Sequence, residues 1–284
     1  MKEGINFGFL PDEYCEAENA GIVIIPVAYD GTSTWGKGAD KGPEAMIEAS
    51  ANMELYDIET DSEVYKKGIF TEDITGGDIS TTEMIDAVHG TTRYYLENNK
   101  FIVVIGGEHS VSIGSIKAHA QHFKDLTVLQ LDAHSDLREE YNGSKYNHAC
   151  VMARTKEFCP IVQVGIRSMD SSEKDSMDKE VVFFAKEIHN KTDWIKKVIS
   201  KLSKNVYISI DLDVFDPSIM PSTGTPEPGG LLWYEVLEFL KTVIEKKNVV
   251  GFDVVELCPD DRNAAPDFMA AKLVYKLLSY KFRE

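Results

Sequence analysis

Leu126-Thr127-Val128-Leu129-Gln130-Leu131-Asp132-Ala133-His134-Ser135-Asp136 is the stretch that decides the fold and the site of this protein. Its first half, residues 126–131, is a largely apolar run that predicts a buried strand. Its second half places three potential metal ligands, Asp132, His134 and Asp136, at alternate positions where the strand opens into a loop. Alternate side chains of an extended chain point the same way, so these three can turn toward one point beyond the sheet edge.

Three other apolar runs also end in acidic or metal-binding residues. The runs and the residues that follow them are 101–105 with His109, 206–210 with Asp211 and Asp213, and 249–252 with Asp253 and Glu256. Open parallel α/β sheets gather their ligands at the carboxyl ends of the strands. The sequence therefore predicts that these four strand ends form a single site.

The remaining sequence alternates between strand and helix patterns. Strands are expected at 21–27, 68–70, 101–105, 128–131, 161–164, 181–184, 206–210 and 249–252, and helices at 43–49, 82–98, 111–123, 194–202, 232–245 and 266–280. Ser110 is placed to cap the helix that follows it. This pattern predicts a single domain over residues 1–284, with a three-layer α/β/α architecture and a mostly parallel sheet of about eight strands.

Composition excludes several classes of partner. The formal net charge of the 284-residue chain is −17 and its isoelectric point is about 4.9, which argues against binding to nucleic acid or to an anionic membrane. An excess of acid suits a cationic ligand, although acidic surfaces also simply keep proteins soluble, and solubility accounts for most of this charge. Residues 1–20 show no secretory signal and no run is long enough to span a membrane, so a cytoplasmic location is expected.

Six side chains form the candidate metal site. They are His109, Asp132, His134, Asp136, Asp211 and Asp213. Four carboxylates and two imidazoles suit hard or borderline divalent ions such as Mn²⁺, and they are too many for one ion that keeps an open position. Two metal ions would use all six and would activate a shared water for hydrolysis. Each aspartate alone could be only a turn or cap residue, but the D-x-H-x-D and D-x-D spacing at three strand ends favours the metal site.

Four ordered motifs carry a family resemblance. They are Gly106-Gly107-Glu108-His109-Ser110, Asp132-Ala133-His134-Ser135-Asp136, Asp211-Leu212-Asp213-Val214-Phe215-Asp216-Pro217 and Thr223-Gly224-Thr225-Pro226-Glu227-Pro228-Gly229-Gly230. They resemble the signatures of the ureohydrolases, the arginase and agmatinase family. The resemblance implies an arginase-like fold, two Mn²⁺ per subunit, hydrolysis of a guanidino group to urea and an amine, and assembly as a homo-oligomer, either a trimer or a hexamer.

The resemblance also assigns roles residue by residue. One Mn²⁺ would be held by His109, Asp132, Asp136 and Asp211, and the other by His134, Asp132, Asp211 and Asp213, with Asp132 and Asp211 bridging. In the family a metal-bridging hydroxide attacks the guanidinium carbon.

Three catalytic roles follow from the same resemblance. Asp136 would take the proton of the hydroxide and pass it to the leaving amine. Glu256 resembles the glutamate that pairs with the guanidinium, and His148 resembles the histidine that shuttles protons to product or solvent. Glu108 is expected to brace its turn rather than touch substrate.

The substrate depends on the loop 137–147, which resembles agmatinase loops and lacks the Asn, Ser and Thr pattern of arginases. An acidic or tyrosine side chain from Glu139, Glu140 or Tyr141 would suit the distal ammonium of agmatine, giving putrescine and urea. Arg138 and Lys145 would instead suit a carboxylate, which keeps a guanidinobutyrase or an arginase open as alternatives. Residues expected to border the same entrance are Trp35, Asp170 and Glu173.

Two further alternatives differ in chemistry. A dinuclear hydrolase could act on a different bond, as in formiminoglutamate or a phosphoester. A catalytically silent, metal-stabilised scaffold is the alternative outside enzymes, and it predicts broken ligand positions, whereas all six are present.

Overall fold

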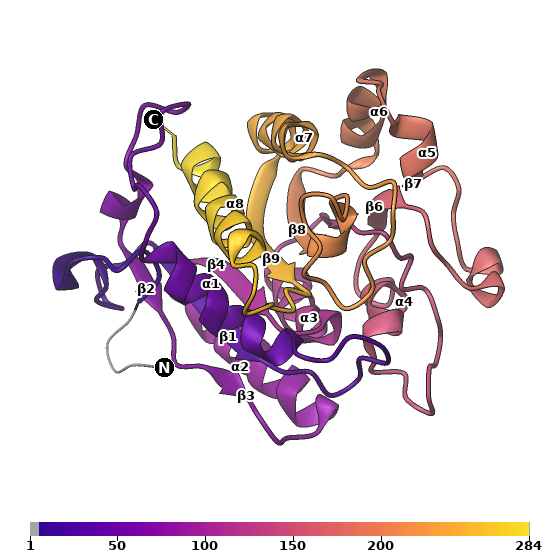
Figure 1. Ribbon diagram of the computed structural model, residues 1–284, viewed down its shortest axis with the longest axis horizontal. Helices are drawn as coiled ribbons and strands as arrows, with labels where there is room; N and C mark the ends of the chain where they lie inside the picture. Colours follow the sequence, from indigo (N-terminus) through magenta and orange to yellow (C-terminus); the bar gives the residue numbers. More distant parts are fainter. Residues whose placement is uncertain (1–5, 284) are drawn as a thin grey trace.

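One parallel sheet organises the protein, and the computed structural model describes residues 6–283 (Figure 1). Its strands lie in the order β2-β1-β4-β9-β8-β5-β6-β7, with β3 also paired to β1. All of these pairings are parallel. The strands are β1 (Ile22–Ala28), β2 (Ile69–Thr71), β3 (Thr75–Gly76), β4 (Phe101–Gly106), β5 (Leu126–Leu131), β6 (Ile161–Ile166), β7 (Val182–Phe184), β8 (Asn205–Asp211) and β9 (Asn248–Val255).

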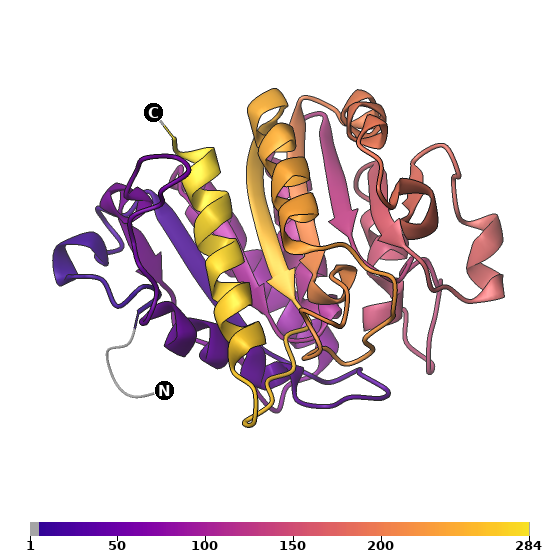
Figure 2. The same cartoon turned by 45° about the horizontal axis from the view of Figure 1, so that its top comes forward.

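Helices cover both faces of this sheet, which confirms the three-layer prediction (Figures 1 and 2). One face carries α1 (Gly42–Ser50), α6 (Asp193–Lys201), α7 (Trp233–Lys246) and α8 (Ala265–Lys281). The other face carries α2 (Thr81–Glu97), α3 (Ser112–His122) and the short α4 (Val151–Thr155). The strand β5 is buried along its whole length because it has helices on both sides, which explains why its sequence does not alternate.

The structure differs from the sequence prediction in three local features. Within residues 6–283 the sheet has nine strands, because β3 forms where only a turn was expected. Helix α4 and the four-residue α5 (Ala185–Ile188) were not predicted, since each is too short to show a helical repeat. The prediction that Ser110 caps α3 is wrong, because Ser110 lies inside a 3-10 turn that Glu108 caps. Since the Glu108 carboxylate accepts from the Ser110 N–H, its expected bracing role is confirmed.

The structure tests only in part what the sequence predicted about membrane crossing, location and domain number. The structure has no helix in residues 6–283 that is long and apolar enough to cross a membrane. The N-terminal stretch 1–20, on which the cytoplasmic location was predicted, begins with residues 1–5, which lie outside the described residues. The single domain over residues 1–284 stays a prediction.

A buried lysine ties α8 to the loop before β2. Lys276 Nζ lies 2.9 Å from Asp57 Oδ2 and 2.7 Å from Glu59 Oε2, and Glu59 also accepts from Lys241 at 2.8 Å. Tyr280 donates a hydrogen bond of 2.6 Å to the same Glu59 carboxylate. Partial burial raises the pKa of Glu59, but these three donors outweigh burial and lower the pKa to about 2.

Glu59→Gln is therefore expected to lower the free energy of unfolding at pH 7 by about 1 kcal/mol, a discounted figure because the Glu59 side chain is 39% exposed. The folded pKa lies below the ordinary value of 4.5, so the contribution is complete above that pH and is lost as the pH falls toward 2. Urea unfolding of both proteins at pH 7, 5 and 3 measures the difference. An effect of equal size at all three pH values would contradict the ion-pair explanation.

Candidate metal centre

Four neighbouring strands supply the site. In the sheet β4, β9, β8 and β5 lie side by side. The predicted metal ligands lie at the carboxyl ends of β4, β8 and β5, and Glu256 follows β9. The strands β4 and β5 come before β8 and β9 in the sequence, but in the sheet β9 and β8 lie between β4 and β5. The carboxyl ends of parallel strands at such a reversal of strand order form a natural crevice for ligands.

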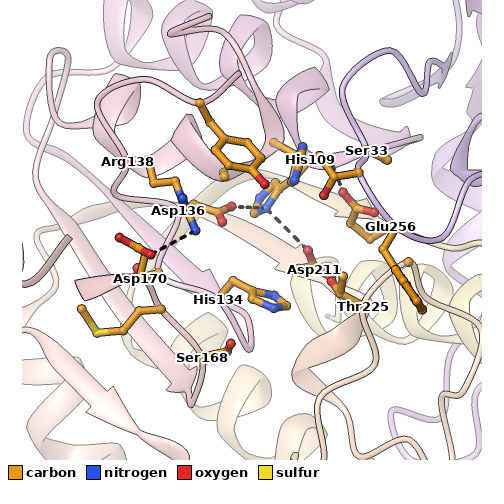
Figure 3. Close-up of a pocket in the computed structure, with 18 of the residues that line it drawn as sticks. Ser33, His109, His134, Asp136, Arg138, Ser168, Asp170, Asp211, Thr225 and Glu256 are labelled. Atoms are coloured by element: carbon orange, nitrogen blue, oxygen red, sulfur yellow. Dashed lines mark hydrogen bonds and ion pairs between the residues drawn. The ribbon is translucent and has the colours of Figure 1, made fainter. Parts of the chain in front are cut away.

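His109 faces three carboxylates from two strands. Its Nδ1 lies 2.9 Å from Asp136 Oδ2 and 3.6 Å from Asp211 Oδ2 (Figure 3). It also lies 3.2 Å from Asp132 Oδ2. His109, Asp132 and Asp211 are all buried, and their ligand atoms lie within 4.8 Å of one another. This group has the composition and spacing of a metal site.

A second group of ligands shares Asp132 with the first. His134 Nδ1 lies 2.8 Å from Asp213 Oδ2 and 3.6 Å from Asp132 Oδ1. The ligand atoms of these three residues also lie within 4.8 Å of one another. The structure thus brings all six predicted ligands together: five form these two adjoining groups, and Asp136 lies 2.9 Å from His109. Asp132 belongs to both groups, whereas Asp211, also predicted to bridge, belongs to the first.

The protonation of His109 tests whether this arrangement fits a cation. Its Nε2 lies 3.0 Å from Ser209 Oγ, and Ser209 donates to Asp253 Oδ1 at 2.8 Å. The Ser209 hydroxyl hydrogen points to Asp253, so the Ser209 oxygen accepts from the Nε2–H of His109, and in the neutral ring Nδ1 is left with a lone pair. Burial lowers the pKa of His109, but Asp132 and Asp136 raise it well above its ordinary value, so Nδ1 attracts a cation. The buried Nδ1 makes no hydrogen bond to any of the described residues and faces carboxylate oxygens. A cation bound between Nδ1 and the carboxylate oxygens would be attracted by both and would offset their mutual repulsion. These residues therefore fit a metal ion.

Two of the acidic side chains, Asp136 and Asp211, are too crowded to keep their charge without a cation. Burial and the neighbouring Asp132 carboxylate raise the pKa of Asp136 to about 7. Burial, followed by the charges of Asp213 and Asp132, raises the pKa of Asp211 well above its ordinary value. Divalent cations would offset this repulsion and keep the ligands ionised.

Two glutamines that the sequence analysis passed over support the ligands. Gln130 on β5 donates to Asp132 Oδ2 at 2.7 Å, and Gln163 on β6 donates to Gln130 Oε1 at 2.6 Å. Their Cα atoms are paired in register across the two strands. The sequence did contain a sign of this support, because each glutamine interrupts an apolar strand. A buried polar side chain needs a hydrogen-bond partner inside the protein.

Arg167 holds the loop that carries Asp213. Its guanidinium donates to main-chain carbonyls rather than to any carboxylate, including Asp213 O at 2.5 Å and Glu227 O at 2.9 Å. The other acceptors are the carbonyls of Gly165, Val214, Phe215 and Pro228. The arginine therefore joins the end of β6 to the Asp213 loop and to the 223–230 loop.

A cavity of about 310 Å³ opens onto these ligands. The predicted catalytic residues Asp136, His148 and Glu256 all line it, as do Trp35 and Asp170 at its mouth. Glu256 Oε1 accepts from the backbone N–H of His109 at 2.7 Å. Asp136 and Glu256 both have a left-handed backbone, with φ of 53° and 67°, which non-glycine residues adopt rarely and at functional sites.

The loop 137–147 contributes less to the cavity than its sequence suggested. Tyr141 lines it and packs edge-on against His148, with ring centroids 5.9 Å apart. The prediction that Glu139 or Glu140 meets the substrate is not supported, because neither is among the described residues that line the cavity. Glu139 instead pairs with the buried Arg154 at 2.6 Å.

Of the two cations that kept a carboxylate substrate open, Arg138 lines the cavity and Lys145 does not. Arg138 lies over the Tyr141 ring, 4.5 Å from its centroid, and 3.8 Å from Asp170 Oδ2 (Figure 3). Lys145 lies over the Tyr146 ring and does not line the cavity formed by the described residues. Glu173 borders the cavity as expected, but its buried carboxylate accepts from Ser135 Oγ at 2.7 Å.

Comparison with known proteins places the chain in a family. A family model described as the arginase family matches residues 20–279. The chain belongs to the arginase family. It is a hydrolase that acts on guanidino groups, and the family depends on a dinuclear metal centre.

Three relatives illustrate this membership of the arginase family. N(1)-aminopropylagmatine ureohydrolase from Synechocystis sp. is 38% identical over 95% of this chain and 94% of that protein. Agmatinase from Pyrococcus horikoshii is 31% identical over 94% of each protein. The crystal structure of agmatine ureohydrolase of Thermoplasma volcanium superposes with a TM-score of 0.84 and 29% identity, covering 94% of this chain and 91% of that one.

Proposed function

We propose that this ureohydrolase cleaves the guanidino group of N(1)-aminopropylagmatine, releasing urea and the corresponding triamine. Agmatine, the substrate predicted from the loop sequence, is the second candidate and would give urea and putrescine. The relatives named for the aminopropyl compound are up to 38% identical to this chain, against 31% for the agmatinases. Both candidates are butylguanidines whose far end carries positive charge.

The charged side chains at the cavity mouth are the observation that supports an amine substrate. Asp170 lies there with its side chain 42% exposed. Arg138 is the one lysine or arginine among the described residues that line the cavity, and it lies 3.8 Å from Asp170 and over the Tyr141 ring, so this pair leaves no net positive charge at the mouth. A substrate carboxylate would need a free cation at this position, and a substrate ammonium needs an acid. The mouth therefore favours guanidinoalkylamines over arginine and guanidinobutyrate.

The proposed metal is Mn²⁺, with two ions per subunit held by the two ligand groups described above together with Asp136. When bound, the ions supply a water with a lowered pKa and offset the charge that develops on the guanidino group. Mixed carboxylate and imidazole donors without thiolates suit this ion. Assembly as a homo-oligomer, a trimer or hexamer, is likewise proposed from the family resemblance.

The side chains of the protein carry out the remaining steps. Glu256 receives the planar guanidinium, for which a partly buried carboxylate is the matching acceptor. Activation of the water releases one of its protons to solvent. Asp136 takes the second proton from the attacking oxygen and delivers it to the amine nitrogen as the carbon–nitrogen bond breaks. His148 lines the cavity and brings a further proton from solvent, so that the amine product leaves as an ammonium ion.

A urea-release panel with Mn²⁺-loaded protein tests this proposal. We expect kcat/KM to fall in the order N(1)-aminopropylagmatine, agmatine, guanidinobutyrate and arginine, with at least about 100-fold between the amines and the carboxylate compounds. Asp170→Asn is expected to raise KM for both amines by about tenfold and, because it releases Arg138 from its acidic partner, to lower KM for the carboxylate compounds. Arginine as the best substrate would overturn the substrate class, and no urea from any of the four would overturn the function.

A further inference from the structure

The Thr32 side chain contacts two residues near the site, although Thr32 is neither a predicted metal ligand nor a predicted substrate contact. It belongs to the loop after β1, and its Oγ1 lies 2.9 Å from Glu108 Oε1 and 3.1 Å from His148 Nδ1. The same oxygen accepts the backbone N–H of His148 at 3.0 Å. One hydroxyl therefore joins a buried glutamate to the histidine that lines the cavity.

The direction of each hydrogen bond follows from Glu108. Its fully buried carboxylate also accepts the Ser110 N–H and the Ser110 hydroxyl, both at 2.8 Å. Burial raises the pKa of Glu108, and these donors together with Thr32 oppose that rise. A carboxylate only accepts, so the single hydroxyl hydrogen of Thr32 points to Glu108 and its oxygen is left to accept from His148.

We propose that Thr32 is a positioning residue that fixes the tautomer of His148. Its oxygen accepts from Nδ1–H of the imidazole, so the neutral ring keeps its hydrogen on Nδ1 and presents the Nε2 lone pair to the cavity. The Tyr141 ring, packed edge-on against His148, limits rotation of the imidazole. This inference rests on the proposed function, in which Nε2 takes a proton from solvent and gives it to the nitrogen of the departing amine.

The purely structural alternative is that Thr32 only anchors its loop. Two substitutions separate the alternatives: Thr32→Val keeps the shape and removes the hydroxyl, and Thr32→Ser keeps the hydroxyl and removes the methyl group. Thr81→Val is the matched control, because Thr81 Oγ1 bonds the Tyr29 hydroxyl at 2.7 Å and has no contact with His148. It removes a comparable threonine hydroxyl contact from the same region of the fold.

The first measurement reads the tautomer without any turnover. ¹⁵N-histidine NMR of Zn²⁺-loaded protein, with the His148 signals assigned by their loss in His148→Asn, reports which nitrogen carries the hydrogen. We expect the Nδ1–H form in the wild type, Thr32→Ser and Thr81→Val, and an increase in the Nε2–H form in Thr32→Val. An Nε2–H form in the wild type, or an unchanged spectrum in Thr32→Val, would overturn the inference.

The second measurement is steady-state urea release with Mn²⁺. Thr32→Val is expected to lower kcat by about 10- to 100-fold with KM within about twofold, and Thr32→Ser to recover kcat to within about threefold. If Thr32 only anchors its loop, Thr32→Val would instead raise KM, and Thr32→Ser would not restore activity. That pattern would also overturn the inference. Absence of urea from the wild type would overturn the proposed function, and the NMR experiment would still decide the tautomer.

Discussion

Asp132→Asn is expected to abolish metal binding and urea release together. Asp132 is the residue shared by the two ligand groups, with Oδ2 3.2 Å from His109 Nδ1 and Oδ1 3.6 Å from His134 Nδ1. An amide is a weak metal ligand and removes one negative charge from between the two positions. We expect the Mn²⁺ content to fall from two ions per protomer to less than one and kcat to fall by at least about 1,000-fold.

Metal analysis after gel filtration and a urea assay at saturating substrate measure this result. Asp193→Asn is the matched control, since it makes the same chemical change at a side chain that is 68% exposed. Circular dichroism shows whether each variant is folded. Two bound ions in Asp132→Asn, with more than a tenth of the wild-type kcat, would rule out the metal centre as assigned.

Glu256→Gln is expected to lower kcat/KM by about 100- to 1,000-fold, equivalent to roughly 3–4 kcal/mol, while both metal ions remain bound. The glutamine keeps the oxygen that accepts the His109 N–H, so the local backbone contact survives. It loses the charge that a buried guanidinium requires from its partner. The effect should therefore appear in substrate binding and turnover, and not in metal content.

Calorimetric titration with a guanidino substrate analogue and metal analysis of the same sample separate these quantities. Glu97→Gln on α2 is the control, because Glu97 is a solvent-exposed residue with only a weak pair to Arg93 at 3.7 Å. A Glu256→Gln protein that binds the analogue as tightly as the wild type would show that another residue receives the guanidinium.

The strands and the ligand set could be predicted because both depend on local sequence. Apolar runs such as those of β4 and β8 identify strands buried on both faces, and each is followed within four residues by acidic or imidazole side chains. Parallel strands place such ends at one edge, so no knowledge of strand order was needed to expect one site.

Contacts between distant segments could not be predicted in the same way. The Thr32 hydroxyl meets residues 76 and 116 positions later in the chain, and a threonine in a polar loop gives no sign of this. Glu139 was misassigned because its partner Arg154 lies on α4, a helix too short to be predicted. In both cases the packing of loops against each other determines the hydrogen-bond or ion-pair partner. The secondary-structure propensities of the local sequence do not determine this packing.

The left-handed backbone of Asp136 and Glu256 has a consequence for engineering. Each position carries a conformational cost of order 1 kcal/mol or more that glycine would remove and asparagine would lessen. Directed evolution toward heat resistance alone would therefore accumulate glycine or asparagine at these two sites and yield robust but inert enzymes. Any such campaign needs a turnover screen in every round.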